Sequence, residues 1–212
     1  MGFQTSSRLS ERVLSLALLL VALAMVGRAQ SQSPIDGIDA RANASEIAKQ
    51  LGSADPHVRQ RSAEALARLA ADDQKKLVEG YYLQEKNKEV RLSMEWALYR
   101  MGKNEALFRI VQDLDSGRQQ QAVGYLSQLD SPELLYPFLK KQNNPPRVNA
   151  GLLKALGQTG NAGTVEVIKP YLDSLQPYVA EAAETATDEI TKRLGETGTG
   201  QISTRPRTAA KP

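Results

Sequence analysis

One pattern of apolar and small residues, spaced as on a single helix face, recurs along most of the chain. Residues 58–69 align with residues 90–101, and further copies follow at 122–129, 152–156 and 179–190. Successive copies are separated by about 27 to 34 residues, a period typical of helical repeat arrays. Each such unit is a helical hairpin that buries its apolar face only by lying against its neighbours. Strand-like alternation is missing, so the sequence predicts an all-α fold of about five stacked hairpins.

Residues that begin and end helices support this reading. Asn104, and Ser131 followed by Pro132, stand where first helices should begin, since Asn and Ser side chains accept hydrogen bonds from free backbone N–H groups. Gly52, Gly102 and Gly157 stand where helices should end. These residues therefore mark expected helix boundaries.

Two stretches carry a resemblance to a known family. DPHVRQRSAEALARL over residues 55–69 and KEVRLSMEWALYRMG over residues 88–102 resemble the second helix of a HEAT repeat, and the Pro-x-Leu sequences at 137–139 and 170–172 resemble the kink of its first helix. The resemblance covers residues 44–194 and is weaker in repeats three to five, which lack the Val-Arg pair. It implies a short right-handed α-solenoid of about five HEAT-like hairpins, with the second helices on the concave side.

The same resemblance assigns a role to two arginines. Arg59 and Arg91 match the arginine ladder of HEAT repeats, whose members bridge carboxylates and backbone carbonyls between repeats. We expect both side chains to be inter-repeat structural residues. Contact of these arginines with an anion is the alternative function.

The second helix of repeat two is apolar on both faces. Leu92, Trp96 and Tyr99 follow one another at helical spacing on the side opposite to the core stripe, and Arg100 is adjacent. In a HEAT-like stack this second face would line the concave groove, where an exposed Trp flanked by apolar residues and an Arg is typical of a protein interface. The hypothesis is that Trp96→Ala abolishes partner binding and leaves thermal unfolding almost unchanged; the alternative is that a neighbouring segment covers Trp96. The predicted partner-binding residues of the concave face are Leu92, Trp96, Tyr99, Arg100, Gln120 and Gly124.

The ends of the chain differ from its middle. Residues 1–29 combine a basic start with the apolar run VLSLALLLVALAMV and small residues before a cleavage point after Ala29, which is typical of a signal peptide. We expect a flexible leader over 30–42, a HEAT-like repeat domain over 43–195 and a disordered tail over 196–212. The mature chain would be exported, to the periplasm or beyond, with no membrane span. An uncleaved N-terminal anchor is the alternative.

Composition argues against most catalytic and metal chemistry. The chain has no cysteine and one histidine, His57, so the usual zinc sites and Cys–His pairs cannot form. The paired carboxylates Asp72/Asp73 and Asp113/Asp115 lie at expected helix ends, where carboxylates cap N–H groups. The net charge of +3 comes from the two ends of the chain, which gives no basic face for nucleic acid. We expect no catalytic residue, no metal and no cofactor.

These observations predict a non-catalytic extracytoplasmic scaffold that binds a protein partner, of unspecified identity, in its concave groove. Two alternatives stay open at this stage. One is an accessory subunit that braces an envelope complex. The other is an enzyme related to the HEAT-like lyases that attach bilin chromophores, against which the export signal argues.

Overall fold

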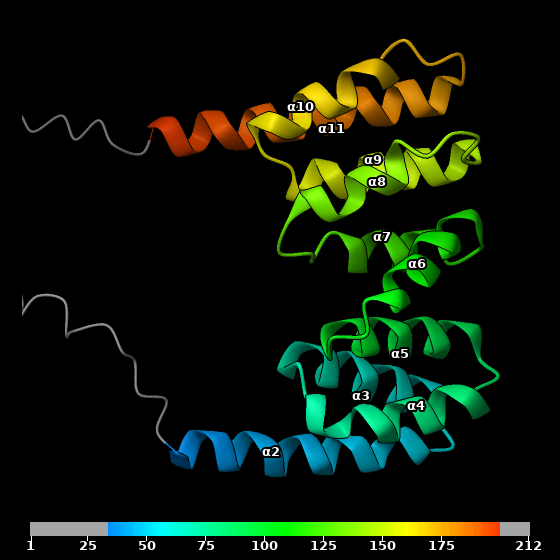
Figure 1. The fold of residues 1–212 in the computed structure, drawn as a ribbon, viewed down its shortest axis with the longest axis vertical. Helices are drawn as coiled ribbons and strands as arrows, with labels where there is room; N and C mark the ends of the chain where they lie inside the picture. The colour runs from blue at the N-terminus through cyan, green and yellow to red at the C-terminus, as the bar shows by residue number, and fades with distance from the viewer. Residues whose placement is uncertain (1–33, 200–212) are drawn as a thin grey trace, which may run out of the picture. The chain divides into compact units, whose positions relative to one another are not determined.

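The computed structural model describes residues 34–199, and within this range every regular element is helical. The all-α prediction is therefore confirmed for this part of the chain. Helices α2 to α11 follow in order, with short 3-10 turns η1 to η5 between or at the ends of several of them (Figure 1). The α-helices are α2 (Pro34–Lys49), α3 (Pro56–Leu69), α4 (Lys75–Gln84), α5 (Lys88–Arg100), α6 (Glu105–Gln112), α7 (Gln119–Leu126), α8 (Tyr136–Leu139), α9 (Pro146–Thr159), α10 (Ala162–Ile168) and α11 (Pro177–Thr199). The 3-10 turns are η1 (Gln50–Gly52), η2 (Asp72–Gln74), η3 (Asp113–Asp115), η4 (Pro132–Leu135) and η5 (Lys169–Tyr171).

The chain divides into two compact units, one ending at Ala42 and the other beginning at Asn43. Of the first unit, the structure describes residues 34–42, which are helical as the first part of α2. The second unit contains the end of α2 and all later helices. The description below concerns this second unit.

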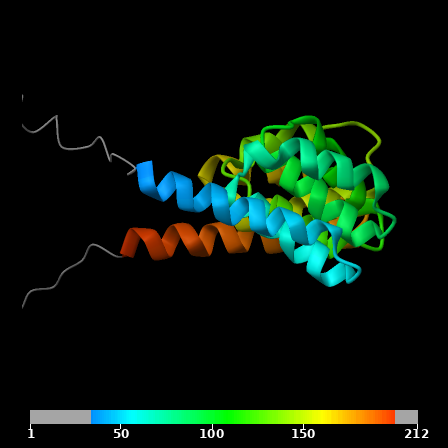
Figure 2. The ribbon, with the colours of Figure 1, turned by 90° about the horizontal axis from the view of Figure 1, so that it is seen from below.

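Every other helix of the second unit contacts the next in a continuous series. Helix α3 packs against α5, α5 against α7, α7 against α9 and α9 against α11, while α4 and α6 both pack on α5. Figure 1 shows α3, α5, α7, α9 and α11 following one another along the long axis. The end of α11 extends past α9, as Figures 1 and 2 both show. One continuous cluster of buried residues runs from Ala44 to Ile190.

Helix starts follow the capping chemistry in some places and not in others. The Asp55 carboxylate accepts a hydrogen bond from the His57 backbone N–H (2.8 Å), and Asn87 caps α5 in the same way. Asn104 and Ser131 do precede helical segments, but neither side chain caps them. The prediction of position was right at these two sites and the prediction of capping was wrong.

Two of the glycines show why a helix end cannot be assigned from glycine alone. Gly102 ends α5 with φ of 85°, the left-handed conformation that glycine adopts without strain. Gly157 instead lies inside α9, where a Cβ would come within 3.0 Å of the Ala186 Cα. Gly157 is therefore required for the close approach of α9 and α11.

The expected boundaries shift at both ends of the array. Helix α2 begins at Pro34, so residues 34–42 of the expected leader are helical. Proline is tolerated at the first helical position because its missing N–H would have no partner there, so Pro34 starts a helix instead of excluding one. Helix α11 continues to Thr199, beyond the predicted boundary at 195. The expected signal peptide at 1–29 and residues 200–212 of the expected tail lie outside the described residues.

No helix between Pro34 and Thr199 combines the length and the apolar character needed to cross a bilayer.

Candidate functional site

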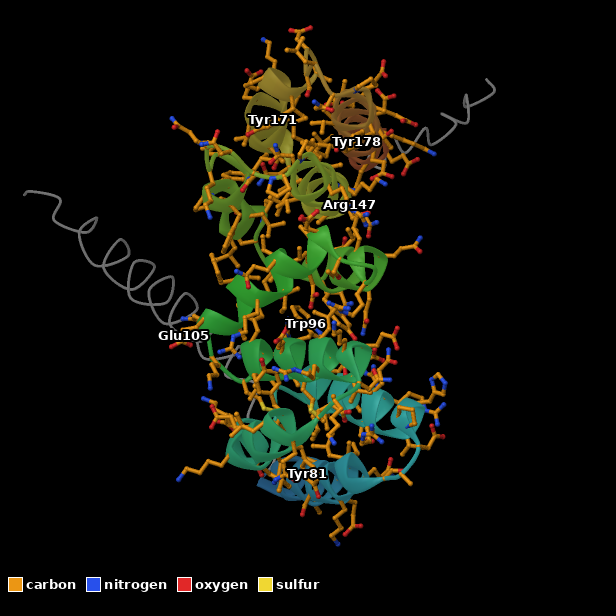
Figure 3. The ribbon with its side chains drawn as sticks, turned by 90° about the vertical axis from the view of Figure 1, so that its right-hand side faces the viewer. Tyr81, Trp96, Glu105, Arg147, Tyr171 and Tyr178 are labelled. Atoms are coloured by element: carbon orange, nitrogen blue, oxygen red, sulfur yellow. The ribbon has the colours of Figure 1, made fainter. Side chains whose placement is uncertain are left out.

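The second apolar face of α5 is covered. Leu92 is fully buried and Trp96 is 3% exposed, so the expectation that these residues line an open groove is wrong. The indole of Trp96 lies between two tyrosine rings, with centroid distances of 5.6 Å to Tyr99 and 5.6 Å to Tyr125. Figure 3 shows Trp96 inside the stack, between α5 and the next helices along the axis. Trp96 is a core residue at the α5–α7 contact.

Tyr125 of α7 covers Trp96 and links α7 to α3 and α5. Its ring is parallel to the indole of Trp96, and its hydroxyl donates a hydrogen bond to the Glu64 carboxylate on α3 (2.7 Å). The Gln121 amide donates to the same hydroxyl (3.0 Å). Burial is the main cause that raises the pKa of Tyr125 above its ordinary value, so the hydroxyl stays protonated and available as a donor. Tyr125, which lies in the apolar copy at residues 122–129, thus covers the face of α5 that was expected to bind a partner.

The remaining predicted residues of α5 also contact neighbouring parts of the protein. Tyr99 is half-buried against the core. The Arg100 guanidinium lies 5.7 Å from the centroid of the Trp96 ring and forms an ion pair with Asp130 at 3.6 Å. The α5 face therefore offers no open apolar surface.

Arg59 and Arg91, which the resemblance assigned to an arginine ladder, have different environments. Arg59 forms a two-point ion pair with Glu85, at 2.6 and 3.0 Å, and its Nη1 donates to the carbonyls of Ser53 and Ala54. It thereby joins the start of α3 to the turn between α4 and α5. Arg91 donates instead to the Tyr82 hydroxyl (3.0 Å) and lies 4.6 Å from the centroid of that ring. Arg91 thus contacts Tyr82 of α4 and interacts electrostatically with Glu95 of its own helix α5.

A cleft of about 620 Å³ lies further along the array. It is formed by α7, α9 and α11, and we call it the α7–α9–α11 cleft. Two of the predicted partner-binding residues, Gln120 and Gly124, line it. The other lining residues are Gly117, Gln119, Val123, Arg147, Lys154, Gln158, Ala182, Thr185, Ala186 and Glu189.

The walls of this cleft are fixed by hydrogen bonds at one end. The Gln119 amide donates to the Arg147 carbonyl (2.9 Å), and the Arg147 guanidinium donates to the Ser116 carbonyl (3.0 Å). These reciprocal bonds tie the start of α7 to the start of α9. Figure 3 marks Arg147 at the side of the array.

Other polar groups of the cleft are available to a ligand. Within residues 34–199, the side chains of Gln120, Lys154, Gln158 and Glu189 form neither a hydrogen bond nor an ion pair, and all four residues are exposed. An amide can both donate to and accept from a peptide backbone, while Lys154 and Glu189 present opposite charges. The arrangement suits recognition of a polar chain segment.

Sequence reasoning missed the α9 side of this cleft. Lys154 and Gln158 are one helical turn apart, and Arg147 lies two turns before Lys154, so the three share a face. Sequence alone fixes the register of the copy at residues 152–156 only to within one residue. The polar spacing of these three residues was the signal that could have located the cleft.

A second polar cluster surrounds a buried carboxylate on α5. Glu95 accepts a hydrogen bond from the Tyr82 hydroxyl (2.8 Å), which itself accepts from Arg91 and from Arg109 (2.6 Å). Burial is the largest cause that raises the pKa of Glu95, and the nearby Asp113 adds to the effect. Sequence reasoning missed this cluster because Tyr82 and Glu95 lie on different helices, α4 and α5, and helical spacing relates only residues of one helix.

Glu95 gives a prediction about stability and pH. Because its pKa in the folded state lies above the ordinary value of 4.5, ionisation of Glu95 opposes folding as pH rises through that range. Glu95→Gln keeps an acceptor for Tyr82 and removes the charge. We expect the variant to gain stability relative to the parent chain at pH 8, and less at pH 4. Urea unfolding at both values measures this, and a difference that does not grow with pH would contradict it.

Comparisons with known proteins give little further information. No protein-family model matches the chain, and no curated protein matches it either. Among solved structures, an engineered protein whose crystal structure was determined by the Northeast Structural Genomics Consortium matches with 20% sequence identity and a TM-score of 0.34, covering 77% of this chain and 93% of that one. A likeness at this level carries no argument about function.

Proposed function

We propose that this chain is a non-catalytic, exported scaffold of the HEAT-like kind that docks a protein segment in the α7–α9–α11 cleft. In this proposal five helical hairpins, α2/α3 to α10/α11, form a short right-handed solenoid. The serial contacts of α3, α5, α7, α9 and α11 support it, as does the agreement of these helices with the five repeat copies. Solenoids expose extended, pre-formed binding surfaces.

The composition of the cleft carries the functional part of the proposal. Gly117, Gly124 and Ala182 have small or no side chains. A chain segment in the cleft can therefore approach the backbone of α7 and α11. Gln120, Lys154 and Gln158 supply unpartnered polar groups around that space. These groups match an extended polar peptide better than an apolar ligand, because each backbone amide of such a peptide needs a hydrogen-bond partner.

Gly124 allows the cleft to be filled without disturbing the fold. A Cβ at this position would meet nothing within 4 Å. Gly124→Leu should therefore place an alkyl chain in the cleft and should also stabilise α7, by about 1 kcal/mol or less, because glycine is a poor helix former. We expect this variant to lose the partner that the immobilised parent chain retains from an extract of its own cells.

Gly80 provides the matched control. It lies within α4, outside the cleft, and a Cβ there also meets nothing within 4 Å. Gly80→Leu should retain the partner at the level of the parent chain. Equal retention by Gly124→Leu and Gly80→Leu would show that the cleft is not the docking site.

A further inference from the structure

A charged cavity of about 540 Å³ lies apart from the α7–α9–α11 cleft, between the α4–α5 turn and the start of α7. Its cationic lining consists of Lys86, Lys88, Arg91 and Arg118. The acids that line it are Glu85, Glu95 and Asp113. The balance between these two sets decides which ligand the cavity can accept.

Each acid already has partners within the protein. Glu85 is bound at both oxygens by Arg59 and also accepts from the Asn87 backbone N–H (2.8 Å). Asp113 is paired with Arg118. Glu95 accepts from the Tyr82 hydroxyl and is buried. Glu85 is therefore matched by Arg59, a cation that does not line the cavity, and Asp113 is matched by Arg118.

The cations, by contrast, are in excess. Lys86 and Lys88 are exposed, and within the described part of the chain neither ammonium has a hydrogen bond or ion pair. The hydrogen bond of Arg91 goes to a neutral phenol, and the buried Glu95 is the acid of the cavity lining that interacts with the Arg91 charge. Arg118 is paired with Asp113 through its Nη2, but its Nε is buried without a partner among the described residues. A negatively charged group would complete this arrangement.

From this excess of cations we infer that the cavity binds a compact oxyanion with two negative charges, for which inorganic phosphate is the simplest representative. The Arg91 guanidinium and the Lys86 and Lys88 ammonium groups together suit an oxyanion. A planar guanidinium can donate two parallel hydrogen bonds, and each lysine adds a donor on a flexible side chain. The volume is sufficient for a small metabolite, because small-molecule sites commonly occupy about 300–1,000 Å³. A phosphate ester or a dicarboxylate would share this recognition.

Isothermal titration calorimetry of the full chain with inorganic phosphate and, separately, with succinate tests the inference. Ionic strength is held constant with sodium chloride, because non-specific attraction is screened by salt. We expect saturable binding of at least one of these anions, and the arm that binds identifies the source of the charge. Absence of saturable binding in both arms would overturn the inference.

A pair of variants separates the cavity from general surface charge. The double variant Lys86→Gln/Lys88→Gln removes two exposed charges and leaves the buried groups unchanged, so it should weaken binding about tenfold. Lys76→Gln/Lys140→Gln removes the same charge from exposed positions outside the cavity and should change binding less than about twofold. Equal effects of the two double variants would also overturn the inference.

Discussion

Replacement of Trp96 by alanine is expected to lower the free energy of unfolding by about 3–5 kcal/mol, the range found when large core aromatics are removed. The indole is buried and stacks on Tyr99 and Tyr125, so its loss leaves a cavity and breaks the aromatic contact between α5 and α7. Tyr125 also holds Glu64, and this hydrogen bond would lose its alignment when α7 shifts. This result is the opposite of the hypothesis drawn from sequence, in which Trp96→Ala spares stability.

Urea denaturation followed by circular dichroism measures the effect. Phe108→Ala is the matched control, because Phe108 is an aromatic residue of the adjacent helix α6 that is 47% exposed. We expect the control to cost less than half as much as Trp96→Ala. Equal costs for the two variants would show that Trp96 is not a core residue.

Arg59→Ala should be the second large effect, with a loss of about 3 kcal/mol or more. The guanidinium satisfies both oxygens of Glu85, whose side chain is 6% exposed, and two backbone carbonyls before α3. Its hydrogen bonds are the main cause that lowers the pKa of Glu85. Without Arg59 this carboxylate would be left nearly buried with only backbone donors.

Two further variants test whether the Arg59–Glu85 ion pair contributes more to stability than an exposed ion pair does. Lys49→Ala breaks the exposed ion pair with Glu46 and should cost about 0.5 kcal/mol or less. Arg59→Met combined with Glu85→Leu removes both charges and should recover much of the stability that Arg59→Ala loses. If Arg59→Ala behaves like Lys49→Ala, the Arg59–Glu85 pair does not hold the start of α3 to the turn between α4 and α5.

The positions of the helices were largely predictable from sequence, because apolar spacing and capping residues are local signals. The five stretches that share one apolar spacing fall on α3, α5, α7, α9 and α11. Pro34 and Gly157 show the limit of such signals. Proline can start a helix as well as end one, and glycine can permit close helix packing as well as end a helix. The residue type alone does not distinguish these roles.

The exposed surface was less predictable, because exposure depends on which helix covers which face. A second apolar stripe on α5 indicated a binding face by itself, but Tyr125 from α7 covers it. Gln120 and Gly124 were predicted to lie on the partner-binding face, and both line the cleft. Lys154 and Gln158 also line it, but they could not be assigned without the register of α9. The charged cavity joins residues of α4, α5 and the turn between them with Asp113 and Arg118, which precede α7, and this combination left no periodic signal.

Photocrosslinking in cells tests the central claim of docking in the α7–α9–α11 cleft most directly. A photoreactive residue is placed at Gln120 or Gln158 in the cleft, and at Lys140 as an exposed position outside it. Docking predicts one discrete adduct, of the same mass, from both cleft positions and none from position 140. Failure to form an adduct at 120 and 158, or an identical adduct at 140, would contradict the claim.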